Sequence, residues 1–130
     1  MTEHETQSCF FAWCNLMSKK HPQLALLFAI PNGSHKSIAA RMKFKREGLK
    51  SGVPDVCLPC GGAMDGKRRN ALYIEFKAKK GVISESQQDW IDRLREAGNW
   101  VEVVRSWESA ANLVIQYLGL KVEKLQVRPD

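Results

Sequence analysis

The sequence predicts a single α/β domain, because patterns typical of strands and of helices alternate along its 130 residues. Apolar and polar side chains alternate over residues 72–77, which is the period of two that a strand gives. Residues 84–98 instead carry apolar side chains at helical spacing, between a serine that favours a helix start and a glycine that favours a helix end. A second strand pattern follows at 100–105 and a second helical pattern at 106–117. A sheet covered by helices buries both kinds of apolar surface.

The first half of the chain continues this order with two helical patterns and two apolar runs. A helical stripe covers residues 4–20, and a basic helical segment at 37–47 ends at a glycine. The short apolar run at 24–30 fits either a strand or a buried turn of helix. The apolar run at 53–59 is preceded by glycine and contains proline near its start, so we expect a strand there.

The strand at 53–59 and the strand at 72–77 are separated by residues that favour turns. These are Gly61, Gly62, Asp65, Gly66 and Asn70. Turn residues between two strand patterns predict an antiparallel hairpin. Such a hairpin brings Asp55 on the first strand beside Glu75 on the second.

Asp55, Glu75 and Lys77 form the pattern with the clearest chemistry. Glu75 and Lys77 lie two residues apart on one strand, so they project to the same side, about 7 Å apart. A Glu-x-Lys triplet alone is usually a solvated pair of little energetic value. Two carboxylates with a lysine, however, can hold a divalent cation and act on a water molecule. The expected pairing with Asp55 therefore favours a catalytic site.

Five short stretches of the sequence carry a resemblance to a known family. They are residues 2–7, 30–33, 48–55, 73–77 and 84–87. The most specific combination is Gly-Val-Pro-Asp at 52–55, Ile-Glu-x-Lys at 74–77 and Ser-x-x-Gln at 84–87. In these residues the chain resembles the PD-(D/E)xK phosphodiesterases, and among them the virus-type replication-repair nuclease family, VRR-NUC. The resemblance runs from residue 2 to Leu118.

This resemblance implies a fold, an activity and a set of metal ligands. The implied fold is a restriction-endonuclease-like core, with a central mixed β-sheet flanked by helices. The implied activity is metal-dependent hydrolysis of phosphodiester bonds in DNA, with one or two Mg²⁺ or Mn²⁺ ions. Asp55, Glu75 and the backbone carbonyl of Phe76 would be the metal ligands, and Lys77 would orient the water or stabilise the developing charge.

Two further polar residues acquire a role only from the resemblance. Glu3 would be the acid that the family carries near its N-terminus, with Glu5 as the alternative. Gln87 would lie at the edge of the active site, orienting the water or Lys77. A structural explanation is also open, since Ser84-x-x-Gln87 is the pattern of a capping box at a helix start.

Basic residues are concentrated before the Pro-Asp motif. The formal net charge is +6, which favours polyanionic partners. The candidate nucleic-acid-binding residues are Lys36, Arg41, Lys43, Lys45, Arg46 and Lys50. A second basic cluster, at residues 67–69, lies at the tip of the expected hairpin. We expect the first segment to bind backbone phosphates, which gives affinity without reading the base sequence.

The four cysteines offer a different hypothesis. No basic-then-apolar leader is visible, so we expect a cytoplasmic protein with reduced cysteines. Cys57 and Cys60 have the spacing of a zinc pair, but a structural zinc site needs four ligands. Cys57 also falls within an apolar strand, where a cysteine behaves as a small hydrophobe. A zinc-stabilised interaction domain is one alternative, and a nucleic-acid-binding module without catalysis is another.

The expected nuclease domain covers residues 1–119, and residues 120–130 form a tail, either loose or added to the sheet as an edge strand. The resemblance further implies a homodimer that cuts branched DNA such as four-way junctions, with one active site in each chain. A two-fold dimer presents two sites symmetrically to a symmetric substrate. Two surfaces are candidates for its interface. They are the apolar side chains of the first helix, Phe10, Phe11, Trp13 and Met17, and the tail at 120–127.

Overall fold

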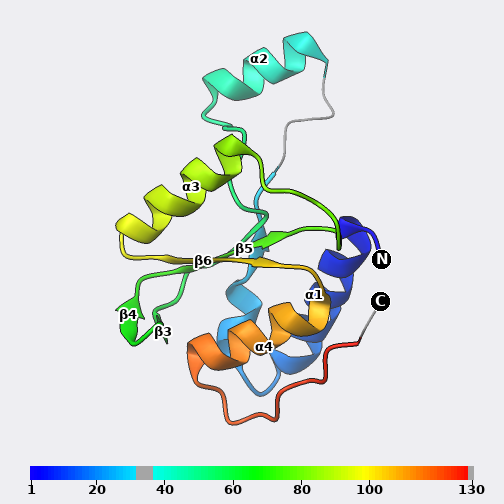
Figure 1. The fold of residues 1–130 in the computed structure, drawn as a ribbon, viewed down its shortest axis with the longest axis vertical. Helices are drawn as coiled ribbons and strands as arrows, with labels where there is room; N and C mark the ends of the chain where they lie inside the picture. The colour runs from blue at the N-terminus through cyan, green and yellow to red at the C-terminus, as the bar shows by residue number, and fades with distance from the viewer. Residues whose placement is uncertain (32–36, 129–130) are drawn as a thin grey trace.

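The computed structural model describes residues 1–31 and 37–128 (Figure 1). Its elements, in chain order, are α1 Glu3–Met17, the 3-10 helix η1 Pro22–Leu26, β1 Phe28–Ala29, α2 Ile38–Arg46, β2 Val56–Leu58, β3 Gly62–Met64, β4 Lys67–Arg69, β5 Leu72–Phe76, α3 Glu85–Glu96, β6 Trp100–Val104 and α4 Trp107–Leu118. In this part of the chain no helix is long and apolar enough to span a bilayer. The predicted α/β class is confirmed.

The central sheet is mixed, as expected, with the strand order β1-β2-β5-β6. The strands β1 and β2 pair antiparallel, as do β2 and β5, whereas β5 and β6 run parallel. The strand β2 is short, Val56–Leu58, and lies between Pro54 and Pro59, which have no amide hydrogen to donate to a ladder. The apolar side chains of the central strand β5 are fully buried, so this strand lies at the centre of the hydrophobic core.

Helices cover both faces of the sheet. Figure 1 shows α1 and α4 together on one side and α3 on the other, next to β6. Phe10 of α1 and Phe76 of β5 are completely buried, and their ring centroids lie 5.7 Å apart. This contact fixes the N-terminal helix against the strand that carries Glu75.

The apolar side chains of α1 that were a candidate dimer surface pack largely against the core of their own chain. Phe10 is fully buried, and Phe11, Trp13 and Met17 are half-buried and pack against the same core. The expectation that this helix leaves a large apolar side free is therefore wrong. The first helix stripe is centred on Thr6, Phe10 and Cys14, which are its buried residues.

The segment between β2 and β5 holds more structure than the expected turn. Strands β3 and β4 form a separate two-stranded ribbon, which turns at Asp65 and Gly66 with φ of 56° and 73°. The ribbon packs on α4, where Gly62 lies so close to the Tyr117 ring that a Cβ atom would be 2.4 Å from it. Strands of three residues are too short to show a hydrophobic period, so the sequence pattern did not reveal them.

The apolar run at 24–30, for which the sequence left a strand and a turn of helix open, contains both. It starts within the 3-10 helix η1 and continues into the two-residue edge strand β1. Leu24 and Leu27 enter the core, whereas both side chains of β1 stay exposed.

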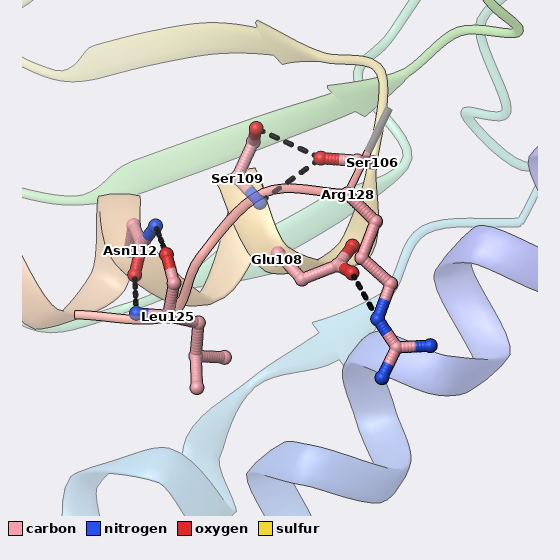
Figure 2. Close-up of polar contacts among 6 residues, drawn as sticks. All are labelled: Ser106, Glu108, Ser109, Asn112, Leu125 and Arg128. Atoms are coloured by element: carbon pink, nitrogen blue, oxygen red, sulfur yellow. Dashed lines mark hydrogen bonds and ion pairs between the residues drawn. The ribbon is translucent and has the colours of Figure 1, made fainter. Parts of the chain in front are cut away.

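The described part of the tail, residues 120–128, is neither loose nor an edge strand. The Asn112 side chain on α4 donates to the Leu125 carbonyl at 2.8 Å and accepts from the Leu125 amide at 2.7 Å (Figure 2). Further along, Arg128 forms an ion pair of 3.8 Å with the buried Glu108. The Asn112 side chain thus bonds both backbone groups of Leu125, as a neighbouring strand would, and holds the tail along α4.

Candidate active site

Asp55 and Glu75 meet where β2 begins beside β5. The register pairs Val56 with Ile74, which puts Asp55 next to the end of β5. The Phe76 amide donates to Asp55 Oδ2 at 2.8 Å, and the Asp55 and Glu75 carboxyl groups lie close enough to influence each other's pKa. The expected approach of Asp55 to Glu75 is confirmed.

Burial governs the protonation of this pair. Loss of solvent raises the pKa of Glu75 to about 8, and the neighbouring Asp55 charge adds to the effect although Lys77 opposes it. Burial also raises the pKa of Asp55, against the hydrogen bond from the Phe76 amide. Two adjacent carboxyl groups that are largely removed from solvent cannot both ionise easily without a compensating cation. The pair therefore has the electrostatics of a site for a divalent cation.

Lys77 directly follows β5 and lies at the same cavity as the two acids. Its backbone amide donates to the Val104 carbonyl at 3.0 Å, which continues the β5–β6 pairing by one residue. The cavity has a volume of about 870 Å³. Its charged and polar lining includes Glu3, Arg41, Lys45, Lys50, Asp55, Glu75, Lys77 and Gln87. Acidic groups and basic groups thus face one shared space.

Gln87 forms the expected capping box and also lies at the cavity, where it contacts Glu75. Its Oε1 accepts from the Ser84 amide at 2.9 Å, while the Ser84 hydroxyl accepts from the Gln87 amide, which completes the capping box. Its Nε2 donates to Glu75 Oε2 at 3.1 Å. The cap fixes the rotamer of the side chain, so the start of α3 holds a donor against the Glu75 carboxyl group.

Glu3, and not Glu5, lies at the cavity. Glu3 Oε2 accepts from the Ala78 amide at 3.3 Å, just beyond Lys77. Glu5 instead accepts from the Thr2 amide at 3.1 Å, within the capping box of α1. Helical geometry turns the two side chains to different sides, which leaves Glu5 a structural role.

Arg105, which contacts the segment that follows Lys77, was not identified from the sequence. Its Nη1 donates to the carbonyls of Ala78 and Gly81 at 2.8 Å each and to that of Lys79 at 3.3 Å. The guanidinium thus holds the segment that follows Lys77, whose first residue, Ala78, also donates its amide to Glu3. The partners are backbone atoms, which any sequence supplies, so no side-chain pattern could have identified the contact.

The candidate DNA-binding residues separate into groups. Arg41 and Lys45 lie one helical turn apart on α2 and line the cavity, together with Lys50. Lys43 and Arg46 are exposed and are not part of the lining. Lys36 lies outside the described residues.

A family model supplies an independent finding. The model of the VRR-NUC domain matches residues 1–108, which is most of the chain. The chain belongs to the VRR-NUC family. VRR-NUC domains are PD-(D/E)xK-type nucleases, so this chain carries a nuclease domain.

A solved structure described as a VRR_NUC domain protein agrees with the fold. It matches with a TM-score of 0.73 and 24% sequence identity, over 92% of this chain and 90% of that chain. At this identity the similarity supports the fold alone. A comparison with curated proteins found no match.

The VRR-NUC family suggests a divalent metal, and the residues here fit one. Among residues 1–31 and 37–128, no three or more His, Cys, Asp or Glu side chains gather to hold a metal ion. In this part of the chain Cys57 and Cys60, which have the spacing of a zinc pair, therefore have no further ligands beside them to complete a zinc site. Asp55 and Glu75 instead bring two carboxylates together at the cavity. A small number of carboxylates with retained water is how Mg²⁺ is usually bound.

The raised pKa of Glu75 predicts how the metal-free VRR-NUC domain responds to pH. Between pH 4.5, the ordinary pKa of a glutamate, and about pH 8, the raised pKa of Glu75, the folded protein holds a proton that the unfolded chain has released. Stability should therefore fall as pH rises through this window. We expect Glu75→Gln to flatten the fall and to be more stable at pH 8 by about 1–3 kcal/mol.

Urea unfolding in EDTA at pH 5, 6.5 and 8 measures this effect. Glu96→Gln is the control, because Glu96 is an exposed acid at the end of α3. It should keep the pH profile of the wild type. Equal pH profiles for wild type and Glu75→Gln would show that the Glu75 carboxyl group is not held protonated.

Proposed function

We propose that this VRR-NUC domain is a metal-dependent endodeoxyribonuclease. It would hydrolyse phosphodiester bonds in DNA and prefer branched forms, such as four-way junctions, during replication and repair or in the processing of phage DNA. The observation that carries the proposal is the half-buried Asp55 next to the buried Glu75, beside Lys77 in a cavity that basic residues also line.

The proposed reaction needs no covalent intermediate. Asp55, Glu75 and the Phe76 carbonyl would hold one or two Mg²⁺ or Mn²⁺ ions. When bound, the metal lowers the pKa of water and offsets the phosphate charge. The Lys77 ammonium group lies at the same cavity and can donate to the attacking water or to a phosphoryl oxygen. Gln87 keeps the Glu75 carboxyl group oriented through its hydrogen bond.

DNA would approach along the side of the cavity formed by α2. Arg41, Lys45 and Lys50 provide positive charge next to the acidic pair. Contacts of such residues with phosphates position a duplex without reading its sequence. Selectivity for branched DNA must then come from shape or from contacts with bases.

Charge reversal on the two sides of α2 tests this path. We expect Arg41→Glu/Lys45→Glu to weaken binding of every DNA form and to lower the salt slope by about 2, because two cavity-lining phosphate contacts are lost. Lys43→Glu/Arg46→Glu makes the same charge change on other sides of the helix and should have a smaller effect. Fluorescence anisotropy over a salt series measures both, and circular dichroism checks the helix. Equal losses from the two pairs would contradict a specific path.

A cleavage panel tests the activity itself and separates it from the alternative of a binding module without catalysis. Labelled four-way junction, flap, nicked, single-stranded and plain duplex DNA would each be incubated with Mg²⁺ and with Mn²⁺. We expect metal-dependent cleavage, fastest on the junction. Tight binding without cleavage of any substrate would instead favour the module that binds DNA without catalysis. The presence of Asp55, Glu75 and Lys77 together argues against that alternative.

We expect a homodimer with two-fold symmetry, so that two active sites can act on a symmetric junction. The contact we propose involves the edge strand β1, because edge strands offer unpaired backbone groups. Leu26 and Phe28 in this region are 52% and 49% exposed.

Light scattering tests the dimer and its interface together. The measured mass should be twice the chain mass of 14.7 kDa, and Phe28→Ser should shift it towards the monomer. Val82→Ser, at another exposed apolar residue, is the control. A wild-type mass of 14.7 kDa with junction cleavage intact would refute the dimer.

A further inference from the structure

The helix α2 stands apart from the rest of the molecule. In Figure 1 it projects beyond α3, and none of its residues is buried. Its nine residues contain four positive charges and no negative one. A short helix is usually stabilised by packing its apolar side on the body of the protein. Only Ala40 and Phe44 of α2 are half-buried, so most of the helix surface is available to a partner.

Two apolar side chains lie on the exposed surface of α2. Ile38 is 69% exposed and Met42 is 57% exposed. They are four residues apart, so they are neighbours on one side of the helix. Arg41 follows Ile38 by three residues, and Lys45 follows Met42 by three. These two basic residues therefore form the neighbouring stripe of the helix, and they line the cavity that holds Asp55 and Glu75. The apolar pair therefore lies at the border of the surface that phosphates would contact.

The charge on α2 indicates what covers this pair. If two copies of the chain met through Ile38 and Met42, the positive charges of both helices would be brought together. Nucleic acid is the complementary partner, since its phosphates match the basic stripe while its bases offer apolar faces. Isoleucine and methionine are among the side chains that proteins insert between base steps.

We propose that Ile38 and Met42 enter between bases of the bound DNA and select DNA whose bases are already unstacked. This inference rests on the proposed nuclease function and gives it a source of selectivity. Insertion into a continuous duplex requires a base step to be opened, at a cost in free energy. At a junction or a mismatch part of the stacking is already lost, so the same insertion is more favourable there.

The test compares two substitutions of the apolar pair. Ile38→Ala/Met42→Ala removes the apolar bulk, and alanine favours the helix. Ile38→Leu/Met42→Leu keeps the bulk and serves as the matched control. We expect the alanine pair to lose the preference for junction over continuous duplex by roughly tenfold, with duplex cleavage unchanged. The leucine pair should keep the preference.

A binding measurement tests insertion without cleavage. In the Asp55→Asn background, a fluorescent adenine analogue at the branch point should brighten on binding as its neighbours unstack. The alanine pair should abolish this gain, whereas Leu16→Ala, at an exposed residue of α1, should leave it unchanged.

The outcomes distinguish this inference from the nuclease assignment. A wild type that cuts no DNA would refute the proposed nuclease, while the fluorescence measurement would still test insertion. Junction preference and fluorescence that are both unchanged in the alanine pair would overturn the role of Ile38 and Met42 and leave the nuclease intact. A dimer that dissociates only in the alanine pair would assign this surface to a second copy and overturn the inference as well.

Discussion

Asp55→Asn should reduce DNA cleavage by about 10³-fold or more while the protein stays folded. Asparagine keeps an oxygen that can accept from the Phe76 amide, so the local geometry is retained. It removes the negative charge that, with Glu75, would hold the metal. Removing one of two adjacent acidic groups also relieves their repulsion, so the metal-free variant should be at least as stable as the wild type.

Three measurements on the same protein establish this result. They are single-turnover cleavage of a labelled junction, Mn²⁺ titration by calorimetry and thermal unfolding. Asp65→Asn is the matched control, because Asp65 is an exposed acid in the β3–β4 turn and asparagine tolerates its positive φ. If Asp55→Asn cleaves at a rate near that of the wild type and binds Mn²⁺ equally well, Asp55 is not a metal ligand.

Lys77→Met should lower the cleavage rate by about 10²–10³-fold and leave metal and DNA binding nearly unchanged. Methionine keeps the apolar part of the side chain, so the packing beside Gly81 survives. What is lost is a cation that would act on the charge that develops in the transition state. An interaction made only in the transition state affects the rate at saturating DNA and not the affinity.

The split between rate and affinity decides the role of Lys77. Lys80→Met serves as the control, since Lys80 is an exposed lysine three residues further along. It should leave the rate unchanged. A Lys77→Met protein with weaker DNA binding but a normal rate at saturating DNA would make Lys77 a phosphate contact.

Local features of the sequence determined most of the elements and the centre of the site. The serine at position 84 starts α3, and the glycine at position 119 ends α4 with a positive φ of 64°. The alternation over residues 72–77 predicted β5, and turn residues before it predicted antiparallel pairing with the strand that follows Asp55. Caps, turns and side-chain period depend on residues a few positions apart, so a single sequence reveals them.

The tertiary structure decided which of the open alternatives hold. It brought Glu3 and not Glu5 to the cavity, and it gave Gln87 a helix cap and a contact with Glu75 at once. It also added Arg105 at the segment after Lys77 and anchored the tail through Asn112. Most of these contacts join residues far apart in sequence and several use backbone atoms, so they exist only once the sheet and its helices have packed.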